Sequence, residues 1–190
     1  MVLGLASSAM AGVPDVGQST ATISGGPYQL YITPAGLGEN LGAKGATITV
    51  TVVDGNGDAI AGYPFQDMTL DDDGNGELDI CPGGSTADAN TNASGVSTFS
   101  GTIAGGGFTQ AGLRVYLGGN ALRPLEPALP INVNSPDIVR DRNVNLADIG
   151  EFTTLFISLP FDFAIDFVED GIENLADIGR FSEAIGSECP

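Results

Sequence analysis

Hydrophobic and polar residues alternate along the first two-thirds of the chain. In residues 47–52 every second position is Ile or Val and the others are Thr, the pattern of a strand with one buried face. Similar apolar segments, separated by Gly, Asn and Asp residues that favour turns, predict strands at 28–33, 96–103, 113–117 and 129–133. Short strands at such spacing, roughly seven in all, predict an antiparallel β-sandwich domain over residues 19–134.

The hydrophobic pattern changes at residue 135. The sequence Asn-Leu-Ala-Asp-Ile-Gly-x-Phe occurs at residues 145–152 and again 29 residues later, at 174–181. In both copies apolar residues recur every three or four positions, which predicts an amphipathic helix. These residues are Leu146, Ile149, Phe152 and Phe156 in the first copy, and Leu175, Ile178, Phe181 and Ile185 in the second. The repeat predicts a small all-α domain over residues 135–190, in which an acidic loop precedes each helix.

Composition narrows the range of functions. The chain has 24 Asp and Glu residues against 6 Lys and Arg, no His, and a net charge of −18. So few cations exclude a nucleic-acid binder that uses a basic face. The absence of His excludes a His-dependent catalytic triad and a His-ligated zinc site. Because half of the acidic residues, 12 of 24, lie in residues 136–190, this region is expected to bind a metal.

The acidic loops fit the twelve-residue calcium loop, which takes its ligands from defined positions including 1, 5, 7, 9 and 12. The first loop supplies Asp137, Asp141, Asn143, Asn145 and Asp148 at these positions, and the second supplies Asp166, Asp170, Ile172, Asn174 and Asp177. The last Asp would reach the ion from the first turn of the helix. The alternative is a pair of solvated turns in which these two Asp residues act only as helix caps. The shared register of the two loops favours Ca2+.

This duplicated loop and helix, closed each time by Asn-x-x-Asp, resembles a type I dockerin module over residues 136–190. The resemblance implies two bound calcium ions and docking to a cohesin through loop positions 10 and 11. In this chain those positions are Leu-Ala pairs, at 146–147 and 175–176. The family usually has hydroxyl-bearing residues there. An apolar pair could instead pack on a sandwich of this chain or of a neighbour.

Three other positions depart from the dockerin pattern. Position 3 lacks a side-chain oxygen in both loops, where it is Val139 and Val168. This loss should weaken calcium binding. Arg142 stands where the family has the tight-turn glycine of position 6, and Glu173 replaces an aliphatic residue at position 8.

Residues 54–62 and 92–99 resemble two hairpins of bacterial Ig-like domains, which implies an Ig-like sandwich over most of residues 40–134. Such domains usually serve spacing, adhesion or assembly. A third metal site is predicted in this region, because Asp71, Asp73, Asn75 and Asp79 match loop positions 1, 3, 5 and 9. Position 12 is Pro82, so an Asn-Gly hairpin loop is the competing interpretation.

The two cysteines, Cys81 and Cys189, allow an intramolecular disulfide, a cross-link between molecules, or two buried thiols. Residues 1–11 are apolar, then small, and end in an Ala-x-Ala sequence, which is typical of the end of a secretory signal. The competing interpretation is an uncleaved strand, within residues 1–18, that packs on this chain or is donated to a neighbouring copy. Either interpretation places the protein outside the cytoplasm, and we expect it to be extracellular, either secreted or at the cell surface. No apolar run reaches the length of a membrane span.

These features predict a secreted, calcium-binding structural protein that assembles with other copies of itself into extracellular fibres or a surface layer. The alternative is a dockerin-type docking module that binds a cohesin-like partner or a cell-surface component as a monomer. A glycoside hydrolase with paired carboxylates is disfavoured, because the acidic residues cluster in turns and the chain has no Trp. We therefore expect a protein that is not an enzyme.

Overall fold

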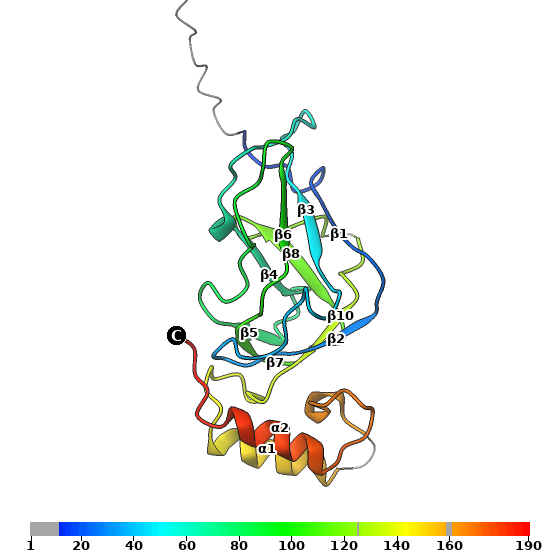
Figure 1. The fold of residues 1–190 in the computed structure, drawn as a ribbon, viewed down its shortest axis with the longest axis vertical. Helices are drawn as coiled ribbons and strands as arrows, with labels where there is room; N and C mark the ends of the chain where they lie inside the picture. The colour runs from blue at the N-terminus through cyan, green and yellow to red at the C-terminus, as the bar shows by residue number, and fades with distance from the viewer. Residues whose placement is uncertain (1–11, 125, 159–160) are drawn as a thin grey trace, which may run out of the picture.

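The computed structural model describes residues 12–124, 126–158 and 161–190. The chain is mainly β, with 29% strand against 15% helix. Within these described residues, the strands all come from residues 12–134, here called the strand-rich part. Both α-helices belong to residues 135–190, here called the loop-helix part, and lie together at one end of the long axis (Figure 1).

Short strands make several small sheets in the strand-rich part. The strands are β1 (Thr20–Ile23), β2 (Tyr28–Tyr31), β3 (Ile48–Thr51), β4 (Met68–Asp72), β5 (Leu78–Ile80), β6 (Val96–Phe99), β7 (Gly105–Gly107), β8 (Leu113–Leu117), β9 (Asn120–Ala121) and β10 (Ile131–Asn134). Antiparallel pairing gives the orders β1-β3-β6, β4-β8-β9 and β5-β7. A 3₁₀-helix, η1 (Phe65–Asp67), precedes β4.

The alternation that predicted β3 is confirmed by burial. Ile48 and Val50 are fully buried, whereas Thr49 and Thr51 are partly exposed. Side chains from all of the larger strands join this core, among them Leu30, Phe99 and Val115. Strands are also present at the predicted segments of β2, β6, β8 and β10, while β1, β4, β5, β7 and β9 were not singled out from the sequence.

One pair of strands contradicts the purely antiparallel arrangement. β10 runs parallel to β2, with Ile131 opposite Tyr28 and Asn134 opposite Tyr31. Parallel strands require a long connection. Here the connection is nearly the whole strand-rich part, so neighbouring turns give no sign of the pairing.

Both predicted helices are present, as α1 (Leu146–Phe156) and α2 (Leu175–Ala184). Each begins with a capping box. The Asn145 side chain accepts a hydrogen bond from the Ala147 N–H at 2.8 Å, and Asp148 accepts one from the Asn145 N–H at 2.9 Å. Asn174 and Asp177 do the same in α2. These caps satisfy backbone donors that a helix start leaves unpaired.

The predicted apolar faces of the helices are wrong at their first residues and, in the second copy, also at Ile178 and Ile185, which are exposed. Leu146 is 83% exposed and Leu175 is 80% exposed, so neither packs on the strand-rich part of its own chain. The space between the helices is filled instead by Phe152 and Phe181, whose ring centroids are 5.0 Å apart. Loop residues complete this second core, including Phe167 and the 3₁₀-helix η2 (Phe163–Ile165).

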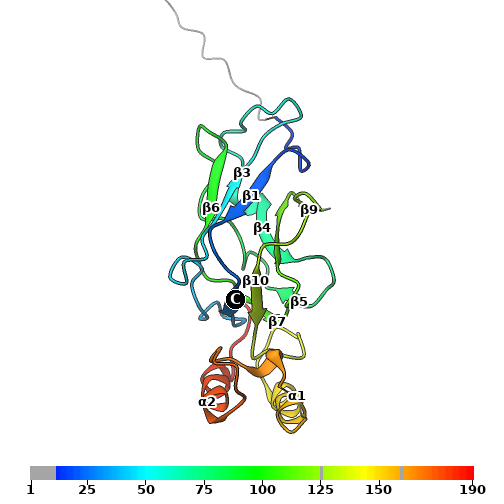
Figure 2. The same ribbon diagram turned by 90° about the vertical axis from the view of Figure 1, so that its right-hand side faces the viewer.

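The loop-helix part rests directly on the strand-rich part (Figure 2). Of the three alternatives for the cysteines, the structure has the intramolecular disulfide Cys81–Cys189, with a Cα separation of 5.7 Å. Tyr31 of β2 belongs to the second core, and the Arg180 guanidinium lies 4.4 Å from the centre of its ring. Covalent and packing contacts therefore join the two parts.

The predicted signal or donor strand lies, for residues 1–11, outside the described residues. Residues 12–18 lie beside the turn that comes after β3, where the Asp15 N–H donates to the Val53 carbonyl at 2.9 Å. This end of the molecule is opposite α1 and α2 (Figure 1). Among the described residues, no helix combines the length and the hydropathy needed to cross a bilayer.

Candidate metal centre

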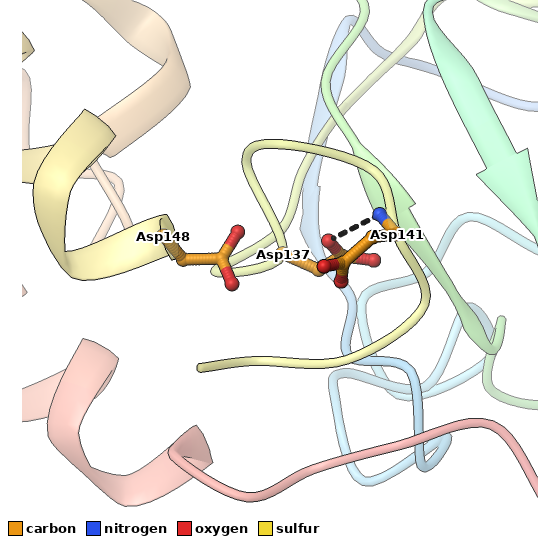
Figure 3. Close-up of side chains that lie close together, drawn as sticks. All are labelled: Asp137, Asp141 and Asp148. Carbon is orange, nitrogen blue, oxygen red and sulfur yellow. Dashed lines mark hydrogen bonds between the residues drawn. The ribbon is translucent and has the colours of Figure 1, made fainter. Parts of the chain in front are cut away.

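Three carboxylates gather in the first acidic loop, residues 137–148, here called loop 1. Oxygen atoms of Asp137, Asp141 and Asp148 all lie within 4.8 Å of one another, the one such acidic group in the described part of the chain. Figure 3 shows Asp148 projecting from the start of α1 toward the other two side chains. An all-oxygen cluster of this kind could hold a hard divalent cation.

The buried carboxylates of loop 1 also organise its backbone. Asp137 accepts hydrogen bonds from the N–H groups of Asp141 (3.1 Å) and Arg142 (2.9 Å). Asp148 accepts from Val139 (3.0 Å) in addition to the helix cap. Each carboxylate therefore closes one turn of the loop, and the two carboxylates lie close to each other.

The two buried carboxylates of loop 1 form no ion pair with a Lys or Arg side chain within the described residues. Asp137 and Asp148 are fully buried, and neither takes part in an ion pair. Burial raises the pKa of Asp137 to about 6; the Asp141 N–H opposes this rise and the nearby charge of Asp148 adds to it. A bound metal ion would favour the charged form of Asp137.

The second acidic loop, residues 166–177 and here called loop 2, repeats the hydrogen bonds of loop 1. Asp166 accepts from the N–H groups of Asp170 (3.2 Å) and Gly171 (3.1 Å), and Asp177 accepts from those of Val168 (3.0 Å) and Asn174 (2.9 Å). Asp166 and Asp177 are also buried. The same sequence pattern thus folds in the same way twice, although Asp166, Asp170 and Asp177 do not all meet within 4.8 Å.

The predicted ligands at position 9, Asn145 and Asn174, act as helix caps. The Asn145 oxygen is bonded to the helix, and its amide donates to Asp141 (3.2 Å) and to the Asn143 carbonyl (3.1 Å). Asn174 donates to Asp170 and to the Ile172 carbonyl in the same way. Position 9 therefore orients the groups at positions 5 and 7 in both loops.

Positions that depart from the dockerin pattern make contacts of their own. Val139 and Val168 offer their backbone N–H groups, and their side chains are partly exposed. Arg142 adopts φ 68°, as a glycine would, and its guanidinium binds both oxygens of Asp79 at 2.6 and 3.0 Å. Glu173 accepts a hydrogen bond from the Asp162 N–H.

Loop 1 lies against strand β7. The Gly107 N–H donates to the Asp137 carbonyl at 2.7 Å, and Arg140 reaches across to the Gly76 carbonyl. The hydrophobic pattern of the sequence did not predict this contact. The three consecutive glycines could have indicated it, because glycine inside a strand often marks the close approach of another segment.

Loop 2 contacts the strand-rich part through a partly buried ion pair. Lys44 lies between Glu39, at 3.0 Å, and Glu169 of the loop. Burial raises the pKa of Glu169 to about 7, against the effect of its hydrogen bond from Lys44. The backbone carbonyl of Asp166 accepts a further hydrogen bond from Asn134 at 2.7 Å.

The structure does not bring the predicted third site together. Asp79 is bound to Arg142, and Asn75 accepts a hydrogen bond from the Glu77 N–H. Asp71, Asp73 and Asp79 do not meet as a metal-sized group within the described residues. The buried carboxylate here is Asp72, which accepts from the N–H groups of Gly74 and Leu78 at 2.8 and 2.9 Å. Its place on the inward face of β4 follows from the alternation of that strand.

Comparison with known proteins gives no match, whether with protein-family models, with curated proteins or with solved structures. The chemistry of the two loops is therefore inferred from their own residues.

Proposed function

We propose that the chain is a secreted calcium-binding structural protein, with an Ig-like sandwich and a dockerin-like pair of calcium loops. The observation that carries this proposal is the pair of buried carboxylates Asp137 and Asp148, which face each other without a paired Lys or Arg in the described residues. Their hydrogen bonds recur in loop 2. Oxygen ligands are the ones that calcium prefers.

A structural role outside the cell is supported by three further features. The Cys81–Cys189 disulfide is of a kind that persists in oxidising compartments. Copies with a net charge of −18 repel one another, so bound cations would favour assembly. The loop-helix part and residues 12–18 lie at opposite ends (Figure 1), which suits a head-to-tail filament.

The proposal is tested with the full chain by titrating calcium in a calorimeter. Sedimentation velocity and negative-stain imaging in millimolar calcium, and again after chelation, then report on assembly. We expect two bound ions, loss of helical signal on chelation, and polymers only with calcium. The control is Asp148→Asn with Asp177→Asn, which should bind no calcium. A wild-type chain that binds none would reject the proposal.

Docking to a partner is a second candidate function, favoured by the exposure of Leu146 and Leu175. These leucines occupy equivalent places at the starts of the two helices and are both at least 80% exposed. A monomer could present them to a cohesin-like protein or a cell-surface component. The variant Leu146→Asp with Leu175→Asp should then lose binding to a purified cohesin, whereas Ile157→Asp, at the far end of α1, should keep it. Equal binding by both variants would argue against this candidate.

A further inference from the structure

Strand β7 consists of three buried glycines, Gly105, Gly106 and Gly107. Glycine in a strand weakens it, so a run of three needs a structural reason. At Gly106 the reason is space rather than backbone conformation, because its φ lies outside the left-handed region. What occupies that space is a side chain of loop 1.

The carboxylate of Asp137 lies where a side chain at Gly106 would begin. A Cβ atom on Gly106 would overlap Oδ2 of Asp137 and lie 2.5 Å from its Cγ. Pairing with β5 fixes the strand, so the carboxylate would have to move. That movement would break its hydrogen bonds with the N–H groups of Asp141 and Arg142, which shape the loop.

The residue opposite Gly106 holds the same loop at a second point. Asp79 of β5 is the direct antiparallel partner of Gly106, and cross-strand partners place their side chains on one face of a sheet. On that face Asp79 binds the guanidinium of Arg142 through both oxygens. The paired strand residues Gly106 and Asp79 thus contact loop 1 at two positions. Position 1 is Asp137 and position 6 is Arg142.

Loop 2 meets the strand-rich part without using a predicted ligand side chain. Asp166 presents its backbone carbonyl to Asn134 (2.7 Å) and Gln29 (3.4 Å). The side-chain contact comes from Glu169, which pairs with Lys44. Of the two loops, we therefore expect only loop 1 to be affected by a substitution in β5 or β7.

From these contacts we infer that loop 1 is a composite metal site, in which Gly106 and Asp79 of the strand-rich part position the ligand Asp137 and the turn at Arg142. Loop 2 is independent of both residues. The inference rests on the proposed function, that the loops bind calcium. We therefore expect the loop-helix part to bind metal with full affinity only when it packs on the strand-rich part of the same chain.

The test measures calcium affinity of each loop separately in the full chain. Asp177→Asn leaves loop 1 to be titrated alone, and Asp148→Asn leaves loop 2. Gly106→Ala is added to each background, because changes around a metal ligand typically cost roughly 10–100-fold in affinity. We expect that loss for loop 1 and unchanged affinity for loop 2. The matched control is Gly101→Ala, whose new Cβ would meet nothing closer than 4.0 Å, and it should alter neither loop.

Unchanged loop 1 affinity in Gly106→Ala would overturn the composite site and leave the proposed function standing. Absence of calcium binding in the wild type would overturn both. Folding of each variant is checked by hydrogen exchange in β3 and β6. If Gly106→Ala does not fold, Asp79→Asn decides: roughly tenfold weaker binding at loop 1, with loop 2 unchanged, supports the inference. Equal affinity at loop 1 overturns it.

Discussion

Loops 1 and 2 have the same internal structure but different attachments. In both, the first and last Asp accept backbone hydrogen bonds from equivalent residues. Loop 1 lies on the glycines of β7 and is held on its other side by the C-terminal tail, where the Val144 N–H donates to the Ser187 carbonyl at 2.8 Å. Loop 2 is held by the Lys44 ion pair and the Asn134 amide. A repeated sequence therefore gives repeated local structure, while its surroundings are set separately for each copy.

The largest expected effect is one in which the two repeats behave alike. Phe152→Ala and Phe181→Ala should each lower the free energy of unfolding by about 4 kcal/mol, because both rings fill the same core. Urea denaturation in calcium measures this loss. Exposed Ile157→Ala is the control and should change little. Clearly unequal losses would mean that the helices do not share one core.

Removing the disulfide should loosen loop 1 and leave loop 2 unchanged. Cys81→Ser with Cys189→Ser frees a tether across 108 residues and should cost about 3 kcal/mol. The C-terminal tail pairs with loop 1, so hydrogen exchange should rise at residues 143–144 and 186–189. Residues 166–177 should keep their protection. Equal loosening of both loops would contradict the view that the tether acts on loop 1.

The helix caps offer a smaller, symmetric test. Asn145→Ala and Asn174→Ala should each cost about 1 kcal/mol of stability, because each removes the acceptor for one N–H of the first helical turn. Thermal unfolding followed by circular dichroism measures the effect. Serine at either position keeps an acceptor oxygen and should restore most of the loss. A loss at only one helix would show that the two caps are not equivalent.

The smallest effect concerns position 6, where the loops differ. Gly171 has φ 75°, so Gly171→Ala should cost about 1 kcal/mol. Arg142→Gly relieves a similar strain but removes a partly exposed ion pair with Asp79, so its net effect should stay below about 0.5 kcal/mol. Both are measured by urea denaturation after chelation of calcium. A much larger loss in Arg142→Gly would show that the ion pair contributes more than a surface pair does.

Local patterns in the sequence predicted the elements that depend on neighbouring residues. Alternation placed β3, an apolar segment between turn residues placed β8, and the repeated Asn-x-x-Asp placed the starts of α1 and α2. The first and last carboxylates of loop 1 were also predicted, and the structure brings them together. The strands β5 and β7 could not be found this way, because three residues are too few to show a period.

By itself, then, the sequence determined the two loop-helix repeats, since capping, turn formation and helical periodicity act over a few residues. The tertiary structure decided which hydrophobic residues became buried, leaving Leu146 and Leu175 outside a core that aromatic rings already fill. It also decided that Arg142 binds Asp79, that Cys81 meets Cys189, and that Asp137 lies over Gly106. These contacts join residues at least 31 positions apart (106 to 137), and the packing of one part on the other brings them together.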